Sequence, residues 1–496
     1  MSKTPFQSRI ERITNTEHVR ISAASAPHAT LANTTKSVQN TDEDKFASEG
    51  LPANFTKGLQ HDQNGVLVGG YTLFMDAIND APEQDFTNLE PNAVNFTTEI
   101  NGAAPSWRGW ESPRTGHYHD LEGPDADAVG MAPAPELGSA ELSLEMAEVY
   151  AMAMLRDVRF TELETGVGGD PDTAISTADV VDALTLSKLF TYTGNLQTDR
   201  RLAGRLMDAD VYDIDEPTGT ALPTVRADLQ FRGSGPGDER GHFVSQFMLV
   251  GNSSSGSGVS ITPQNGFIRY GNQLIDQRGL SFAPGSDQMI NWSHWLDVQN
   301  GANLGSANDL VGKHFIATPR DIATYVRFDA LYQAYLNACL ILLGVGYPSQ
   351  PGFPEQNTLP RTGFATFGGP HILSLVTEVA TRALKAARRQ KFNYHRRARP
   401  ERIGGLLTLA AGNSGVLGTQ SKVALDAMLG HLNSFLPMVA HHNGIRLAKG
   451  NPANLTLAPQ VNWLDGPNNS NNHLLAMAFA EGSPMHPAYA AGHATV

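Results

Sequence analysis

The sequence predicts an all-α protein built from helical bundles. Apolar residues recur at helical spacing in several long stretches, whereas the alternating pattern of a half-buried strand is scarce. With 496 residues, of which 41% are hydrophobic and 17% charged, the chain is long enough for one large helical body or for two or more ordinary domains. Together these observations favour packed helical bundles.

Three regions follow one another along the chain. Residues 1–60 are polar and weakly periodic, which predicts an extended N-terminal arm suited to contacts with a neighbouring subunit. Residues 61–370 are expected to combine a part rich in loops, where Pro, Gly, Asp and Asn are frequent, with a first helical bundle. Residues 371–496 are expected to form a second bundle.

Helix signals are clearest after residue 138. Ser139 is the expected N-cap of a helix with Glu141 in its first turn, and its apolar residues run from Leu142 to Met154 at helical spacing. Further helices are predicted over residues 178–192, 321–345, 371–399, 422–438 and 473–480.

Composition and charge exclude several classes of function. The formal charge of −14 argues against nucleic acid or an anionic membrane as a partner. The single cysteine, Cys339, excludes an intramolecular disulfide and a cysteine-based zinc site, and it is expected to pack as a small apolar residue. The N-terminus has no apolar signal segment, and the longest apolar run, residues 338–345, is far shorter than the roughly 20 residues that span a bilayer. We therefore expect a soluble protein, with the cytoplasm as its default location.

A basic stretch near residue 395 carries the first chemical signal. On a continuous helix, Lys391, His395 and Arg399 lie at i, i+4 and i+8 and share one face, and Pro400 places Arg399 at the helix end. Two cations that converge on one point are costly to bury unless an anion lies between them. The guanidinium fork suits two oxygens of a tetrahedral oxyanion. The alternative interpretation is a solvated basic helix face.

The loop from Ser483 to His493 carries the second signal. A Gly492-His493 step after a turn can open a helix, whose first backbone N–H groups bind oxyanions. The imidazole of His493 beside such an anion could donate and accept a proton near neutral pH. The two segments together predict a site for a tetrahedral oxyanion.

The pattern Lys-x7-Arg-Pro, followed by His-Pro-x-Tyr-x-[Ser/Ala]-Gly-His, resembles the vanadium-dependent haloperoxidases. The likeness is greatest to the bromoperoxidase branch of red algae and cyanobacteria. It extends over nearly the whole chain, and the other segments that carry it are residues 55–62 (FTKGLQHD), 120–125, 155–157, 245–247, 364–371 and 395–401. A related superfamily of acid phosphatases shares the site motif alone.

The resemblance implies two four-helix bundles and one vanadate per subunit. Lys391 and Arg399 would bind vanadate oxygens, Gly492 would donate its backbone N–H, and His493 would be the acid/base that helps hydrogen peroxide enter the site. Bromide or iodide would be oxidised to a hypohalous equivalent that halogenates a small organic acceptor. Cationic donors withdraw electron density from a bound peroxide, so a halide can attack it.

The resemblance also assigns two further positions. His486 matches a histidine near the halide site, and Ala491 stands where the family usually has a serine that contacts vanadate. A hydrogen bond to a charged ligand is worth roughly 1.5–3 kcal/mol, so we expect weaker retention of the oxyanion. The resemblance leaves open a structural calcium ion in the loop 352–361 and implies a large homo-oligomer.

The family pattern continues with an Arg-x5-His element well downstream, whose Arg completes the cage and whose His binds vanadium. The given sequence ends at Val496 before such an element. We therefore expect the second bundle and the cage to be incomplete in this chain, and the chain as given to be inactive. No vanadium-ligating histidine is identified, because Arg446 with His441-His442 has the wrong order and position.

Two alternatives stay open at this point. One is an acid phosphatase that uses the same anion cage with His493 as nucleophile. The other is a catalytically disabled subunit that forms oligomers, which Ala491 and the incomplete cage favour. The halide preference is open, and His61, His117 and His119 are expected to be structural residues of loops.

Overall fold

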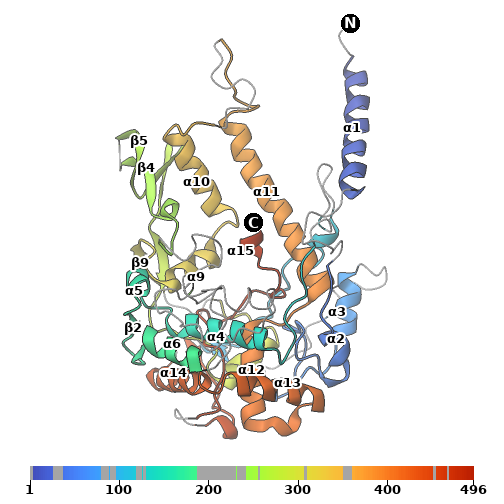
Figure 1. Cartoon of the computed structure of the whole chain (residues 1–496), viewed down its shortest axis with the longest axis vertical. Coiled ribbons are helices and arrows are strands. Elements are labelled where there is room, and N and C mark those ends of the chain that lie inside the picture. Colours follow the sequence, from blue (N-terminus) through green and yellow to red (C-terminus); the bar gives the residue numbers. More distant parts are fainter. Residues whose placement is uncertain are drawn as a thin grey trace, which may run out of the picture.

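Helices dominate the computed structural model of the chain, so the predicted all-α class is confirmed and the strands form only small sheets. The structure describes residues 4–25, 37–79, 86, 89, 96–118, 126, 130–186, 231, 242–254, 257–305, 310–349, 360–450, 454–465 and 469–496. Figure 1 shows a helical body from which α10 (Gln333–Gly344), α11 (Gly369–Arg389) and the sheet of β4 (Val250–Ser254) and β5 (Ser257–Asn265) rise.

The main hydrophobic core lies between four helices of this body. They are α4 (Ala140–Met154), α12 (Pro400–Asn413), α13 (Thr419–His431) and α14 (Leu436–Lys449). Each contributes buried apolar side chains, among them Tyr150, Leu407, Leu425 and Val439. Burial of one such side chain stabilises the fold by roughly 1.5–3 kcal/mol. The core thereby fixes the start of α12, which follows Arg399 directly.

The start of α4 agrees with the sequence prediction. Ser139 is the N-cap, and its hydroxyl accepts a hydrogen bond of 3.1 Å from the N–H of Leu142. Helix α6 (Thr177–Leu186) lies in the predicted range 178–192, whose residues from 187 onward are outside the described part.

Two helices predicted as continuous are broken, and a third is not formed. The range 321–345 divides into α9 (Pro319–Phe328) and α10 (Gln333–Gly344), because the backbone is extended at Asp329, with ψ of 147°. The range 422–438 spans α13 and the start of α14, and residues 473–480 are irregular. Apolar periodicity marks buried positions, and it does not mark the points where tertiary contacts bend the chain.

The described strands pair antiparallel, and the larger sheet and the β8–β9 ribbon lie beside α10 and α9. The four-stranded sheet has the order β5-β4-β6-β7, and the separate ribbon pairs β8 with β9 next to α9. The bounds are β4 (Val250–Ser254), β5 (Ser257–Asn265), β6 (Phe267–Tyr270), β7 (Gln273–Asp276), β8 (Gly279–Phe282) and β9 (Leu310–His314). Two-residue pairs join β1 (Glu99–Ile100) to β10 (Leu455–Thr456) and β2 (Gly169–Asp170) to β3 (Ile175–Ser176).

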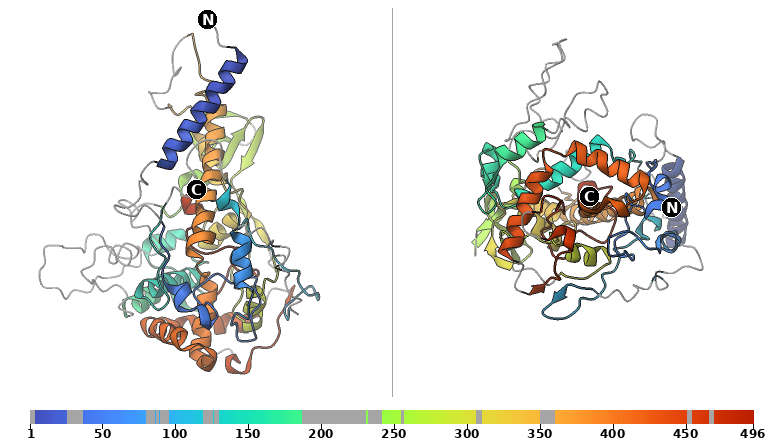
Figure 2. Two further views of the ribbon diagram at one scale, coloured as in Figure 1. Left: turned by 90° about the vertical axis from the view of Figure 1, so that its right-hand side faces the viewer. Right: turned by 90° about the horizontal axis from the view of Figure 1, so that it is seen from below.

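The N-terminal segment departs from its prediction. Residues 1–60 were expected to be extended, but α1 (Pro5–Ser25) is a long helix that stands away from the body in Figures 1 and 2. Phe6, Ile10 and Ile13 recur at helical spacing, and this signal indicated the helix. The other short helices are α2 (Asp42–Lys45), α3 (Tyr71–Ile78), α5 (Phe160–Thr165) and α8 (Trp292–Gln299).

The C-terminal turn α15 (Gly492–Thr495) lies between α10 and α11 (Gly369–Arg389), as Figure 1 shows. Among the described helices, none is by itself both long and apolar enough to cross a membrane. Helices α13 and α14 meet that test only as a pair bent by 89°.

Candidate functional site

The basic stretch that carries the site leaves the helix earlier than predicted. After α11 the backbone widens into a π-helical segment, Gln390–His395, and then reverses at Arg396, whose φ is 43°. Lys391, His395 and Arg399 therefore do not share one face of a continuous helix. The cause is a distant segment: the N–H of Phe55 donates to the carbonyl of Arg396 at 2.7 Å. This pairing draws the chain away from the helix axis.

Lys391 and Arg399 nevertheless converge on one oxygen. The carbonyl of Pro487 accepts from Lys391 Nζ at 2.8 Å and from Arg399 Nη1 at 3.5 Å, and Lys391 Nζ lies 3.4 Å from the carbonyl of Ala488. A neutral oxygen thus lies between two cations, where an anionic oxygen would be held more strongly. Burial, and then the charges of Arg399 and Arg388, lower the pKa of Lys391 to about 6.

Arg388 adds a third buried cation to the site. Its Nη2 is 3.6 Å from Oε2 of Glu111, whereas its Nε and Nη1 have no hydrogen-bond partner among the described residues. His486 lies between these groups, with Nε2 at 3.8 Å from the same Glu111 oxygen. Burial, followed by the charges of Arg399, Lys391 and Arg388, holds the pKa of His486 well below its usual value. The imidazole of His486 is therefore neutral at neutral pH.

A series of polar contacts fixes the orientation of the Arg399 guanidinium. The Nε of Arg399 donates to the hydroxyl of Ser483 at 2.8 Å, and that hydroxyl in turn donates to Oε1 of Glu401. The same carboxylate oxygen is 3.2 Å from the ammonium of Lys57, which also donates to the carbonyl of Ser483 at 2.7 Å. Burial lowers the pKa of Lys57 to about 8 although Glu401 opposes the shift.

His493 has different partners. It is exposed on the one-turn helix α15, its Nε2 is 3.1 Å from Oδ2 of Asp329, and its carbonyl accepts from the hydroxyl of Tyr335 at 3.0 Å. Ala491 is the N-cap of this turn, and Gly492 is its first residue. The structure thus brings Lys391, Arg399 and His486 together, and it pairs the His493 ring with Asp329 on the α9 side.

The loop histidines have structural partners. Buried His61 is 3.0 Å from the hydroxyl of Thr56, and His117 Nε2 is 3.0 Å from Asn393 Nδ2. His119, residues 120–125 and residues 352–359 of the proposed calcium loop lie outside the described residues. Within the described part of the chain, no three His, Cys, Asp or Glu side chains form a group that could hold a metal ion.

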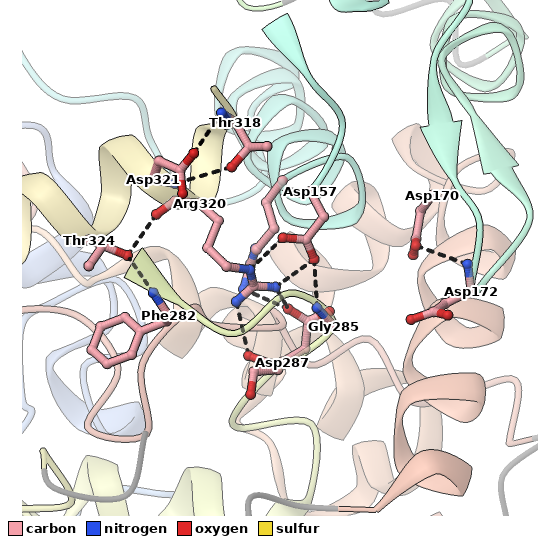
Figure 3. Close-up of polar contacts among 12 residues, drawn as sticks. Asp157, Asp170, Asp172, Phe282, Gly285, Asp287, Thr318, Arg320, Asp321 and Thr324 are labelled. Carbon is pink, nitrogen blue, oxygen red and sulfur yellow. Dashed lines mark hydrogen bonds and ion pairs between the residues drawn. The ribbon is translucent and has the colours of Figure 1, made fainter. Parts of the chain in front are cut away.

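A second group of charges, drawn in Figure 3, joins α9 to the loop after α4. Arg320 Nε is 2.5 Å from Asp157 Oδ1, and Arg320 Nη2 is 3.1 Å from Asp287 Oδ1. Arg156 Nη1 reaches the same Asp287 oxygen at 2.8 Å, and buried His442 lies 3.2 Å from its Oδ2. Burial would raise the pKa of Asp287, but Arg156 first and then the other partners hold it well below its usual value. Each of these arginines faces a carboxylate, so the cluster cross-links the fold.

Several residues of the site were not anticipated from the sequence. They are Lys57, Glu111, Arg388, Glu401 and Ser483. Lys57 and Glu401 lie in segments 55–62 and 395–401, which were noted only for the resemblance, and Arg388 belongs to the basic run before Lys391. The sequence did contain a signal for Arg388. It lies three residues before Lys391, and side chains at i and i+3 of a helix lie close together on one face. Nothing in local spacing indicated that Lys57 would meet Glu401.

Comparisons with known proteins show to which proteins the chain is similar. No protein-family model matches the chain. A vanadium-dependent bromoperoxidase of Corallina pilulifera is 37% identical over 476 residues, which cover 90% of this chain and 73% of the relative. One of Corallina officinalis is 35% identical over 514 residues, covering 96% of this chain and 79% of the relative.

Solved structures share the fold, and one of them is similar over almost the whole chain. It is the second vanadate-dependent bromoperoxidase (AnII) of Ascophyllum nodosum, described as homohexameric. The two chains are 23% identical, with a TM-score of 0.66, over 99% of this chain and 68% of the other.

Proposed function

The chain belongs to the family of vanadium-dependent bromoperoxidases, and from that premise we propose that it oxidises bromide or iodide with hydrogen peroxide, with vanadate as its cofactor. One bromide ion, one molecule of hydrogen peroxide and one proton give hypobromous acid and water. Bromide loses two electrons, the O–O bond breaks, and one peroxide oxygen leaves as water. The relatives give no support to the acid phosphatase alternative.

The donors of the site suit the oxygens of vanadate. The observation that carries the proposal is the convergence of Lys391 and Arg399 on the single carbonyl oxygen of Pro487. The buried Nε and Nη1 of Arg388 add two donors without partners in the described part of the chain. Lys391, Arg399 and Arg388 would hold the oxyanion, because guanidinium and ammonium groups only donate and vanadate oxygens accept. When bound, vanadate supplies the Lewis-acid centre at which hydrogen peroxide is activated.

The chain's own groups contribute charge and proton transfer. The buried cations draw electron density from oxygens bound between them, and this favours attack by a halide. Because the carbonyl of Pro487 can only accept, His486 donates to it from Nδ1 at 3.0 Å, and the Nε2 of this neutral imidazole carries a lone pair that can accept a hydrogen bond. Asp329 accepts from Nε2 of His493 and orients that ring on the α9 side, and the acid/base role of His493 belongs to this proposal through the resemblance alone.

Vanadate binding and bromide oxidation test the proposal in the full-length protein. Vanadate affinity is measured by equilibrium dialysis, and bromide oxidation by formation of tribromide. We expect Lys391→Met to lose both, whereas Lys422→Met, at an exposed lysine of α13 paired with Asp426, keeps both. Wild-type protein that binds no vanadate would contradict the proposal, as would hydrolysis of phosphate esters without oxidation of bromide.

Assembly into a homo-oligomer is part of the same proposal. The Ascophyllum nodosum neighbour is described as homohexameric. Helix α11 exposes two apolar side chains one turn apart, Leu375 at 42% and Val379 at 55%, which suits burial against another copy. Light scattering of the purified protein should give a multiple of the monomer mass. A calcium ion in the loop 352–361 and a cytoplasmic location stay predictions.

A further inference from the structure

A groove of about 300 Å³ runs along α9, between the β8–β9 ribbon and the start of α10. Its walls are apolar although they face solvent: Leu280, Leu310 and Phe328 expose 47%, 46% and 53% of their surfaces. Apolar side chains gathered in a concavity of this size are typical of a site for a small ligand.

The wall of the groove is held in shape by polar contacts. The hydroxyl of Thr318 caps α9 by accepting from the N–H of Asp321, and the N–H of Phe282 in β8 donates to the hydroxyl of Thr324 at 3.4 Å. Figure 3 shows these contacts beside the ion pairs of Arg320, which anchor α9 to the body. The groove is therefore a preformed feature of α9 and β8.

One end of the groove reaches the C-terminal histidine. Asp329 lines the groove, and its carboxylate is the partner of His493 Nε2 at 3.1 Å. The neighbouring Arg327 lies over the Phe282 and Phe328 rings and forms an ion pair of 2.6 Å with Glu481. A ligand in the groove thus lies beside the imidazole that the proposed function employs.

The charges of the rim indicate what the groove accepts. Its described lining residues include two carboxylates, of Asp321 and Asp329, and neither a lysine nor an arginine. Among the described residues, each of these carboxylates contacts an imidazole: His314 Nε2 is 3.0 Å from Asp321, and His493 Nε2 is 3.1 Å from Asp329. Apart from the imidazole of His314, the described lining residues offer an anionic ligand no basic partner, and the two carboxylates repel it, so a neutral ligand is favoured.

We propose that this groove binds the organic acceptor of the peroxidase, an uncharged, electron-rich aromatic compound of the phenol or naphthol class. This inference rests on the proposed function, which supplies hypobromous acid. In the halogenation, a C–Br bond forms and a ring C–H bond breaks. The ring proton and the hydroxide of hypobromous acid leave as water, the ring carbon is oxidised by two electrons, and bromine is reduced.

The test measures binding of 2-naphthol to the full-length protein without vanadate, by fluorescence titration. Gly279 lies in the groove wall, its φ is outside the left-handed range, and a Cβ added there meets nothing within 4 Å, so Gly279→Phe adds bulk at the groove without backbone strain. Gly312→Phe is the matched control, because Gly312 has the same open surroundings on β9 but lies outside the groove lining. Leu280→Asp is a second variant that adds charge in place of bulk.

We expect 2-naphthol affinity to fall at least about tenfold in Gly279→Phe and Leu280→Asp, a change of about 1.4 kcal/mol, and to stay unchanged in Gly312→Phe. The sulfonate 2-naphthalenesulfonate should bind wild type more weakly than 2-naphthol. Equal 2-naphthol binding in wild type and both groove variants, or none in wild type, would overturn the proposal. So would a self-association of wild type that Gly279→Phe abolishes, because the groove would then be an interface between copies.

Bromide oxidation without an acceptor is measured on the same preparations after addition of vanadate. Loss of tribromide formation with intact 2-naphthol binding would contradict the proposed function and leave the groove as a binding site of another reaction. Tribromide formation without 2-naphthol binding would leave the proposed function intact and refute the proposal that the groove binds the organic acceptor.

Discussion

The ammonium of Lys57 lies 3.2 Å from Oε1 of Glu401, and the two side chains expose only 2% and 1% of their surfaces. Hydrogen bonds connect this pair to the anion site, because Glu401 accepts from Ser483 and Ser483 accepts from Arg399. Two buried charges of opposite sign therefore hold the orientation of a guanidinium that faces the proposed oxyanion.

Ser483 should influence anion affinity without touching the anion. Ser483→Ala removes the acceptor of Arg399 Nε, and a hydrogen bond to a charged group contributes roughly 1.5–3 kcal/mol. We expect vanadate affinity, measured by titration calorimetry, to fall by about 10- to 150-fold. Ser434→Ala, which removes a hydrogen bond to Ala183 on the other side of the core, is the control and should bind vanadate as wild type does. Unchanged affinity in Ser483→Ala would show that Arg399 holds its orientation alone.

Glu401 should be important for stability. Glu401→Leu leaves Lys57 buried without its carboxylate, and loss of one partner of a buried pair costs about 3–5 kcal/mol. The matched variant is Asp426→Leu, which breaks the half-exposed pair with Lys422 and should cost at most about 1 kcal/mol. Urea unfolding monitored by circular dichroism measures both. Similar losses in the two variants would contradict the importance of the buried pair.

Anion binding should be coupled to proton uptake at Lys391. Its folded-state pKa of about 6 lies below the ordinary value of 10.5, so between these pH values the unfolded chain binds more protons than the folded one. The stability of the anion-free protein should therefore rise with pH through that window, and the cost of the buried charge is fully present below pH 6. A bound oxyanion raises the pKa again, so binding near pH 8 takes up a proton.

Proton uptake on anion binding is measured by titration calorimetry in buffers of different ionisation enthalpy. Molybdate serves as the anion, because it is a tetrahedral oxyanion that does not titrate in this pH window. Proton uptake near pH 8 should approach one per anion, and affinity should decrease as pH rises above 6. Lys391→Met should abolish the uptake and, at pH 5, stabilise the anion-free protein. Binding heats that do not depend on the buffer would contradict the coupling.

Ala491→Ser tests the position at which the chain departs from the family pattern. A serine there adds a hydroxyl at the N-cap of α15, next to Gly492. We expect vanadate to bind more tightly, by roughly 1.5–3 kcal/mol if the hydroxyl reaches the anion. Ala494→Ser, on the same turn, is the control. An equal gain in both variants would mean that a serine in this turn acts by means other than contact with the anion.

Much of the site was accessible from the sequence because it depends on residue type and on motif spacing. Lys391 and Arg399 were singled out from residue type and spacing, and His486 was assigned by the resemblance; the structure places all three around the carbonyl of Pro487. His493, which was expected beside the same anion, faces Asp329 instead. The helical geometry offered for them was wrong, since α11 ends at Arg389 and a π-helical segment follows. The cations converge because separate elements are packed against one another.

The sequence by itself determined the all-α class, the start of α4 at Ser139 and the identity of the cations, since helical periodicity, capping and charge are properties of neighbouring residues. Only the tertiary structure decided that residue 55 would pair with Arg396, that Lys57 would meet Glu401, and that His493 would face Asp329. Such contacts join segments up to several hundred residues apart. They depend on which buried surfaces fit together, and no local pattern in the chain records that fit.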